Sequence, residues 1–259
     1  MHRYFFTTKD TFINSGSDSI TGEDFKDKNT GQDEILELKK VFFDRTFSYQ
    51  TRVLLQFDVD EIESYISSSV LPSDYQLNLR LYETEGTSGL SEEYTIAAYP
   101  LSQSWDEGIG KEGDVPKTTE GCSWAFSKNN QGVEVKWNAY SSSISSSVDE
   151  GGDTINTTST FTSSFVDGNQ ISEGSFIEDD EATQVFSTES PDLNMDITTI
   201  ANKWFGGVNE NYGLMLRLSG SRETSSTSFE DIKFFSRQTN TIYSPKIELK
   251  WDDHLPATG

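Results

Sequence analysis

Side chains suited to acid–base or nucleophilic chemistry are few in this sequence. His2 and His254 are its two histidines, and both lie near an end of the chain. A Ser-His-Asp or Cys-His site needs a histidine held in a pocket against its nucleophile, and a zinc site needs more Cys and His ligands than this chain has. Cys122 is the one cysteine, and its neighbours Trp124 and Phe126 favour a buried, inert thiol. We therefore expect no enzymatic activity and no catalytic residue.

Adjacent aromatic and acidic residues form a candidate sugar site. Asp106 and Glu107 could imitate the acid and nucleophile of a glycosidase. With 43 acidic residues in the chain, however, such pairs arise by chance, and loop carboxylates that accept backbone N–H groups are the simpler interpretation. Trp105, in the same Gly-flanked loop, is the best candidate for an exposed ring that stacks on a sugar. The predicted carbohydrate-binding residues are therefore Trp105, Asp106 and Glu107.

Carboxylates elsewhere provide candidate ligands for calcium, which prefers hard oxygen donors. The candidate ligands of a structural calcium are Asp58, Asp60 and Asp153. The alternative is that these charges are simply solvated, because the chain shows no EF-hand spacing. We expect no other cofactor.

The charge balance excludes several classes of partner. The chain has 20 basic and 43 acidic residues, a net charge of −23. Such a surface repels nucleic acid, whose binding needs Lys and Arg to displace phosphate counterions, and it disfavours docking on anionic lipid. The first residues, Met1 to Lys9, show no signal-peptide pattern, and no apolar run is long enough to cross a bilayer. We therefore expect a protein made in the cytoplasm.

Hydrophobic patterning predicts an all-β domain with short helices. Residues 75–82 alternate best, with Leu77, Leu79 and Leu81 on one face. Further strands are predicted at residues 3–14, 34–43, 49–58, 94–101, 122–126 and 133–137, with others between 211 and 251. A short helix is expected over residues 60–67 with Asp60 as its N-cap, and another from Asp196 to Trp204, ended by Gly206 or Gly207.

Residues 139–192 differ in kind from the rest. They contain eleven Asp or Glu and no Lys or Arg, in a Ser/Thr-rich context. We interpret them as an acidic insertion in one domain that spans residues 1–259. Phe161, Phe165, Phe176 and Phe186 favour partial packing of the insertion on that domain, and a mobile loop is the alternative.

Several short motifs occur in an order that resembles a known family. They include Thr8-Lys-Asp-Thr-Phe-Ile13, Asn29-Thr-Gly31, Arg52-Val-Leu-Leu-Gln-Phe-Asp58, Leu77 to Tyr82, Trp105-Asp-Glu-Gly108, Trp137 with Gly151-Gly-Asp153, Asp196-Ile-Thr198, Asn211-Tyr-Gly-Leu214, Phe235-Ser-Arg237 and Ser244-Pro-Lys246. Together they resemble the DNRLRE family, over nearly the whole chain. The signature that names the family is only approximated by Phe235-Ser-Arg237, and the acidic stretch is longer than the family usually carries.

The resemblance implies a jelly-roll-like antiparallel β-sandwich similar to carbohydrate-binding modules. The opening residues, together with Asn29 to Leu36, are also similar to virion structural proteins of tailed phages of marine bacteria. On that basis we expect a non-enzymatic virion component, located on the exterior of the neck, tail or capsid. Its expected partners are other virion proteins and copies of itself in a symmetric assembly. A carbohydrate-binding module for host or algal polysaccharide is the alternative.

Overall fold

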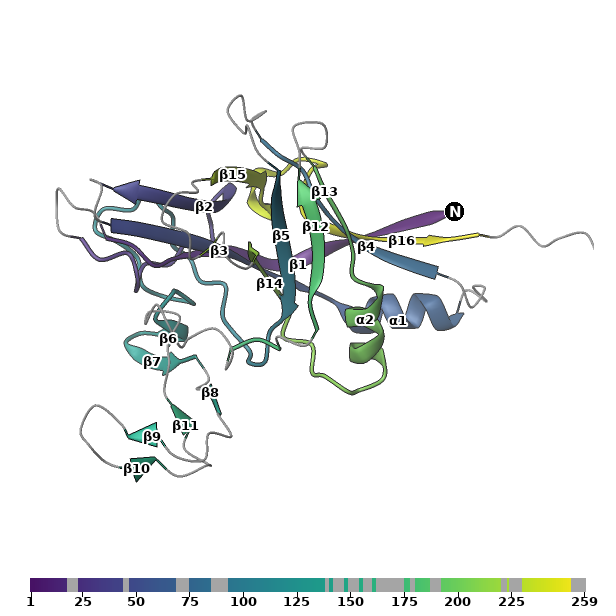
Figure 1. Ribbon diagram of the computed structural model, residues 1–259. Coiled ribbons are helices and arrows are strands. Elements are labelled where there is room, and N and C mark those ends of the chain that lie inside the picture. The colour runs from purple at the N-terminus through teal and green to yellow at the C-terminus, as the bar shows by residue number, and fades with distance from the viewer. Residues whose placement is uncertain are drawn as a thin grey trace, which may run out of the picture.

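We describe the fold from a computed structural model of the chain. The residues that the structure describes are 1–17, 23–43, 47–68, 75–84, 93–137, 140–141, 147–148, 154–155, 160–161, 175–177, 180–186, 192–219, 223 and 230–252. Within them the protein is an antiparallel β-sandwich with two short α-helices (Figure 1). The predicted all-β class is confirmed.

Strand β1 (His2–Asn14) joins the two halves of the sandwich. Its first part pairs with β16 (Lys246–Trp251) and its second part with β3 (Phe47–Phe57), and the register shifts between Thr7 and Lys9. Such an irregularity bends a strand and lets it pass from one sheet to another. The first half-sheet has the order β1, β16, β4 (Tyr75–Leu81) and β13 (Leu193–Asp196). The second has the order β1, β3, β14 (Leu214–Leu218), β5 (Tyr94–Pro100) and β12 (Ala182–Phe186).

Smaller elements complete the fold. β2 (Ile35–Phe43) pairs with β3 and with β15 (Glu230–Phe235), which is followed by the 3-10 helix η1 (Arg237–Thr239). β6 (Phe126–Asn130) and β7 (Val133–Lys136) form a hairpin. The two-residue strands are β8 (Tyr140–Ser141), β9 (Ser147–Val148), β10 (Thr154–Ile155) and β11 (Thr160–Phe161). The strand predicted at residues 122–126 therefore begins only at Phe126.

The main hydrophobic core lies between the two half-sheets. Leu77, Leu79 and Leu81 of β4 point into it and are fully buried, as their alternation predicted. Leu55 of β3 and Ile96 of β5 meet them from the second half-sheet. Because successive strand residues point to opposite faces, each strand contributes every second residue to this core.

The second half-sheet is buried on both of its faces. Leu54 points away from the main core into a second core, which also contains Trp105, Trp124 and Trp137. The segment from Leu101 to Trp137 supplies these rings and thus forms a third layer over the sheet. Burial on both faces explains why β3 carries three consecutive apolar residues, Val53, Leu54 and Leu55, rather than a strict alternation.

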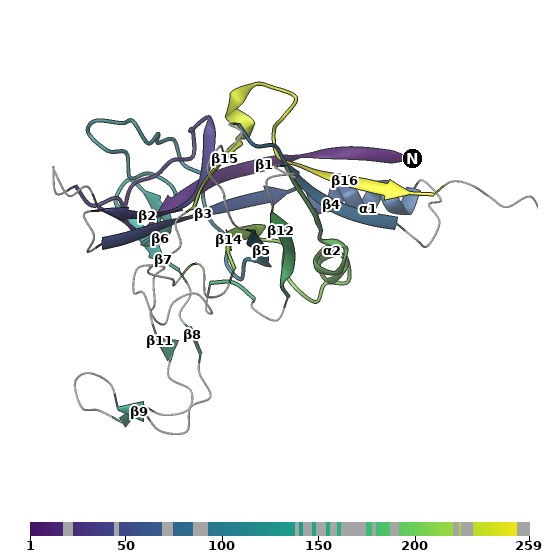
Figure 2. The same ribbon diagram turned by 45° about the horizontal axis from the view of Figure 1, so that its top comes forward.

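Two helices cover one end of the main core (Figure 2). α1 (Val59–Ser68) begins one residue earlier than predicted, and Asp58, not Asp60, caps it by accepting the N–H of Glu61 at 3.0 Å. α2 (Thr198–Phe205) ends at Gly206 as predicted. Its predicted apolar positions are all buried, namely Ile197, Ile200, Ala201 and Trp204. Asp196 accepts the N–H of Thr198, but the N-cap position itself is Ile197.

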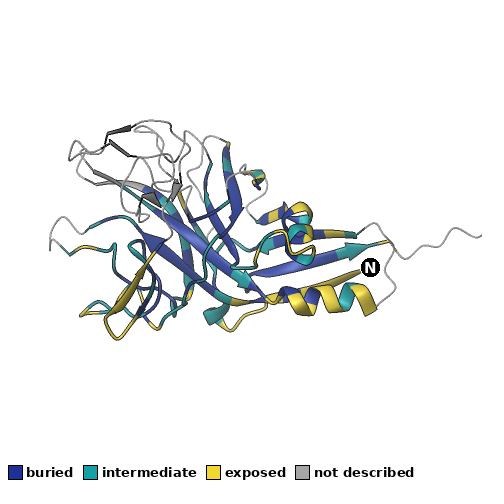
Figure 3. Ribbon diagram, turned by 90° about the horizontal axis from the view of Figure 1, so that it is seen from below, coloured by how far each residue is buried: buried dark blue, intermediate teal, exposed yellow. Residues whose placement is uncertain are grey.

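The sheet curls until its two ends meet. Gln184 of β12 accepts the N–H of Asn194 of β13 at 2.6 Å, so the sandwich is nearly barrel-like. β12 lies inside the predicted insertion, yet it is an integral strand paired with β5. Phe176 and Phe186 are buried, as the packing alternative predicts, and the strands of the sandwich are mostly buried (Figure 3). Phe165 and most of the insertion lie outside the described residues.

Candidate functional site

Trp105 is buried rather than exposed. Its side chain is 1% exposed and fills the second core, and its Nε1 donates to the carbonyl of Tyr212 at 2.8 Å. The ammonium of Lys9 donates to the Trp105 carbonyl at 3.1 Å. The prediction that this ring is available to stack on a sugar is therefore wrong, because the third layer folds it inward.

Asp106 has a local structural role. Its N–H donates to Ser127 at 3.1 Å, and its carbonyl accepts the N–H of Cys122 at 2.7 Å. Its carboxylate lies 3.9 Å from the ammonium of Lys128, and both side chains are partly exposed. These contacts fix the Trp105 loop to the segment that begins β6.

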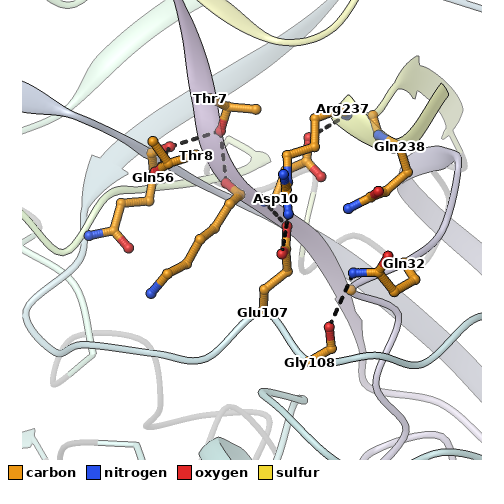
Figure 4. Close-up of polar contacts among 12 residues, drawn as sticks. Thr7, Thr8, Asp10, Gln32, Gln56, Glu107, Gly108, Arg237 and Gln238 are labelled. Carbon is orange, nitrogen blue, oxygen red and sulfur yellow. Dashed lines mark hydrogen bonds and ion pairs between the residues drawn. The ribbon is translucent and has the colours of Figure 1, made fainter. Parts of the chain in front are cut away.

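Glu107 is engaged by two distant parts of the chain (Figure 4). Its Oε1 accepts the N–H of Asp10 at 2.9 Å and the Nε–H of Arg237 at 2.8 Å, while Oε2 accepts from Nη2 of Arg237 at 2.6 Å. A bidentate arginine–carboxylate pair of this kind fixes orientation as well as distance. Glu107 thereby ties the opening strand and η1 to the loop that carries it.

Asn29 locks the same loop from the other side. Its Nδ2 donates to the carbonyls of Glu107 and Cys122 at 2.7 and 2.8 Å, and its Oδ1 accepts the N–H groups of Gly31 and Gly110 at 3.1 and 2.8 Å. All four hydrogen-bonding positions of the amide are used. We call Asp10, Asn29, Glu107 and Arg237 the loop junction. Several of the motifs that carry the family resemblance meet there, which gives them a structural explanation.

Asp10 is the perturbed acid of the loop junction. It is 1% exposed, and burial raises the pKa of its carboxyl to about 7, against the lowering effect of the Arg237 N–H that Oδ2 accepts at 2.7 Å. The nearby Glu107 charge raises the pKa further. Within the described part of the chain, Oδ1 of Asp10 has no hydrogen-bond partner. A carboxyl so placed is a buried titratable group rather than a substrate-facing acid.

The predicted calcium ligands do not come together in the described residues. Asp58 caps α1, Asp60 is exposed in the first turn of that helix, and Asp153 lies outside the described residues. Among the residues described, no group of three His, Cys, Asp or Glu is arranged to hold a metal ion. Since one of the three ligands is not described, the calcium site stays a prediction.

Asp58 and Asp60 do border a pocket of about 500 Å³ at the junction of β1, β3 and the two helices. Its charged lining residues are Lys9, Asp58, Asp60, Glu63 and Glu210. Four carboxylates against one ammonium disfavour an anionic ligand. Three of the four belong to the start of α1 or its cap, where negative charge stabilises a helix without any ligand.

The remaining reactive side chains behave as the sequence predicted, where they are described. Cys122 is fully buried, and burial raises the pKa of its thiol far above its usual range, so the thiol is protonated and inert. His2 is exposed on β1, and its ring lies 5.1 Å from that of Tyr4. His254 lies outside the described residues.

Three arginines of the strands form ion pairs with glutamates. Arg80 lies 3.5 Å from Glu248 of the neighbouring strand, and Arg217 lies 3.1 Å from Glu223. Buried Arg52 pairs with the same Glu223 at 2.7 Å. These ion pairs connect neighbouring parts of the fold.

An exposed aromatic cluster was not predicted from the sequence. We call it the aromatic patch, and it consists of Tyr4, Phe6, Tyr82, Phe235 and Tyr243 around Lys246. Exposure reaches 40% for Tyr4, 54% for Phe6 and 43% for Tyr243. The one available signal was the alternation in β1, where Tyr4 and Phe6 share a face opposite to buried Phe5.

Lys246 lies at the centre of the aromatic patch. Its ammonium is 5.0 Å from the ring centroid of Tyr4, 5.5 Å from that of Phe6 and 4.7 Å from that of Tyr82. It donates to the carbonyl of Ile242 at 2.8 Å, and the residue is 7% exposed. Cation–π contacts of this kind hold aromatic rings at a surface in fixed positions.

Neither a scan against protein-family models nor a search of curated proteins returned a match for this chain. None of the helices in the described ranges is long and apolar enough to cross a membrane.

Proposed function

We propose that this protein is a non-enzymatic structural component of a tailed-phage virion, an adaptor or decoration protein on the exterior of the neck, tail or capsid, and that it acts through protein–protein contacts. The phage assignment rests on the sequence resemblance. The contact mode rests on one observation, the exposed aromatic patch around Lys246.

The aromatic patch has the chemistry of a protein-binding surface. Contiguous exposed rings are unusual on a soluble protein and mark interaction sites. Tyr and Phe are enriched at the centres of protein interfaces, where charged residues are depleted. Ile242, next to Tyr243, is 74% exposed and extends the apolar surface. The net charge of −23 suits an outer location better than contact with packaged DNA.

Mass spectrometry of purified particles tests the function. We expect the protein at a fixed copy number, as a symmetric assembly requires. Its absence from the particles would reject the proposal.

Incorporation of variants tests the surface. Tyr243→Ser should reduce incorporation at least about tenfold, because it removes a central ring of the patch. Val208→Ser, which changes an exposed apolar residue outside the patch, is the matched control and should be incorporated normally. Equal incorporation of both variants would contradict docking through the aromatic patch.

Glycan binding is the second candidate function. The exposed rings of the aromatic patch could stack on a sugar, whereas the ring of Trp105 is buried. Exposed Tyr4 and Phe6 lie on the sheet face that also carries Arg80, whose side chain is 23% exposed. Stacking rings beside fixed polar groups is the usual chemistry of a sugar site. A glycan array tests it. Binding that is lost in Phe6→Ser would favour this candidate, and a flat profile would count against it.

A further inference from the structure

The short helix η1 covers the buried carboxyl of Asp10. The N–H of Arg237, the first residue of η1, donates to Oδ2 of Asp10 at 2.7 Å, and Asp10 is 1% exposed (Figure 4). On another side lies the Trp105 loop, where Glu107 accepts the Asp10 N–H at 2.9 Å. β3 places Leu55 opposite Asp10 in the ladder. Water therefore reaches this carboxyl only if one of these elements moves.

The charges around Asp10 do not balance once its carboxyl ionises. Arg237 supplies positive charge beside it, but both oxygens of Glu107 already accept from that guanidinium. Lys9, the neighbour of Asp10 in β1, donates its ammonium to the carbonyl of Trp105. An ionised Asp10 therefore places a second carboxylate beside one guanidinium. A buried charge that is not compensated is costly unless water reaches it.

The nearby acid Asp33 is engaged elsewhere. Its Oδ1 and Oδ2 accept the N–H groups of Glu34 and Glu112 at 3.1 and 2.6 Å. Its contact with the residue before η1 is made by the backbone, since the Asp33 carbonyl accepts the hydroxyl of Ser236 at 2.6 Å. The charged groups that act on Asp10 are therefore those of the Trp105 loop and of η1.

Of the elements around Asp10, η1 is the least firmly held. The Trp105 loop is fixed by four hydrogen bonds of Asn29 and by the buried ring of Trp105. All three residues of η1 are partly exposed, and Nε2 of Gln238 has no hydrogen-bond partner among the described residues. Asn240, which ends η1, has a left-handed backbone with φ of 53°, which costs energy at a residue other than glycine. We therefore expect hydration of Asp10 to occur by movement of η1.

The segment that begins with η1 also carries part of the aromatic patch. Tyr243 follows η1, and its ring centroid lies 5.4 Å from that of Phe235 and 5.3 Å from that of Tyr82. The carbonyl of Ile242 accepts from the ammonium of Lys246 at 2.8 Å. We call residues 237–243 the η1 segment. Its movement would separate rings that its docked position holds together.

We propose that the η1 segment is a pH-sensitive switch for the aromatic patch: ionisation of Asp10 releases the segment from the loop junction and separates the rings of the patch. Protons favour the docked form, because the carboxyl is neutral there and hydrated in the released form. The apparent affinity of the patch for its partner then falls with the docked fraction. This inference rests on the proposed function, since it describes the regulation of the same surface.

Hydrogen exchange at the Arg237 amide tests the switch. In the wild type its protection factor should fall at least about tenfold from about pH 5 to about pH 8, because the released form loses the Asp10 proton at a lower pH than the docked form. Asp10→Asn keeps an acceptor for this N–H and carries no charge, so its protection factor should be equal at both pH values. A wild-type factor that does not depend on pH, or the same fall in Asp10→Asn, would overturn the proposal.

Glu112→Gln is the matched control for Asp10→Asn. It neutralises another carboxyl whose pKa is raised by burial, but one outside the loop junction. It should therefore show the same fall in Arg237 protection as the wild type.

Urea distinguishes release of the η1 segment from unfolding of the domain. Local release exposes little surface, so exchange at Arg237 should be the same with and without about 1 M urea. Exchange at Leu79, in a strand paired on both sides, should accelerate in urea. Equal acceleration at both amides would overturn the proposal, because the Arg237 amide would then open only with the whole domain. These wild-type measurements decide the question even if a variant fails to fold.

The switch and the proposed function fail separately, because exchange is measured on the isolated protein. A pH-dependent η1 segment in a protein that is absent from particles would reject the function and retain the switch. Exchange at Arg237 that does not depend on pH, in a protein present in particles, would reject the switch and retain the function.

Discussion

At the level of single residues, Asp10 gives the stability of this protein a pH dependence of unusual sign for a carboxylate. Because burial raises its pKa to about 7, the folded protein keeps this proton over a range in which the unfolded chain has lost it. The contribution to the free energy of unfolding is fully present below about pH 4 and is lost as the pH rises to about 7.

Asp10→Asn tests this assignment. The amide stays uncharged at every pH, so the variant should match wild type near pH 4 and exceed its free energy of unfolding by about 2 kcal/mol near pH 8. Urea titrations at the two pH values measure the difference. Equal stability of the two proteins at the higher pH would show that folding does not raise the pKa of Asp10.

Asn29 is the other residue on which the loop junction depends. Asn29→Ala removes four hydrogen bonds and leaves the buried carbonyls of Glu107 and Cys122 without their donor. We expect it to lower the free energy of unfolding by about 3 kcal/mol. Asn130→Ala at the exposed end of β6 is the control, with an expected change within about 0.5 kcal/mol. A small effect of Asn29→Ala in urea unfolding would contradict the role assigned to this amide.

Among the elements, the Trp105 loop depends on close backbone contact with the loop around Asn29. A Cβ atom on Gly31 would lie 2.0 Å from the backbone oxygen of Glu107. Only a movement of the backbone could relieve this clash. Gly31→Ala should therefore separate the two loops and cost about 3 kcal/mol or more. Gly113→Ala, where a Cβ meets nothing within 4 Å, should be nearly neutral. Thermal unfolding followed by tryptophan fluorescence compares the two variants. Similar melting temperatures would contradict the close contact between the Trp105 loop and the loop around Asn29.

Local patterns were sufficient to predict most strands and both helices, because alternation and helical spacing depend on neighbouring residues. Residues 75–82 and the helix ending near Trp204 are examples. Trp105 shows the limit. Its Gly-flanked, acidic loop is typical of an exposed segment, but a third layer that no local pattern encodes buries the ring. The helix cap at Asp58 differs from the predicted cap by two residues, as helix boundaries commonly do.

The candidate site could not be predicted for a related reason. The aromatic patch combines residues of β1, β15 and β16 with Tyr82, just after β4, and Tyr243, after η1, and these are far apart in the sequence. Only the exposure of Tyr4 and Phe6 follows from alternation, and then only if Phe5 is known to face the core.

For the whole molecule, the net charge of −23 destabilises the folded state through self-repulsion. Raising NaCl from about 20 mM to about 300 mM shortens the screening length from roughly 20 Å to about 6 Å. We expect the melting temperature to rise by several degrees in scanning calorimetry. The same series in tetramethylammonium chloride distinguishes screening from sodium binding. A flat or falling melting temperature would contradict the dominance of self-repulsion.

The first and last described strands lie side by side, with Met1 bonded to Trp251. Their geometry has a mechanical consequence. A force that separates these two ends acts on the backbone hydrogen bonds between β1 and β16 one after another. The two strands therefore separate at low force. A force applied along β1, with β3 held in place, acts on many backbone hydrogen bonds between β1 and β3 at the same time, in shear. The resistance of this domain to force therefore depends on which points of it are tethered.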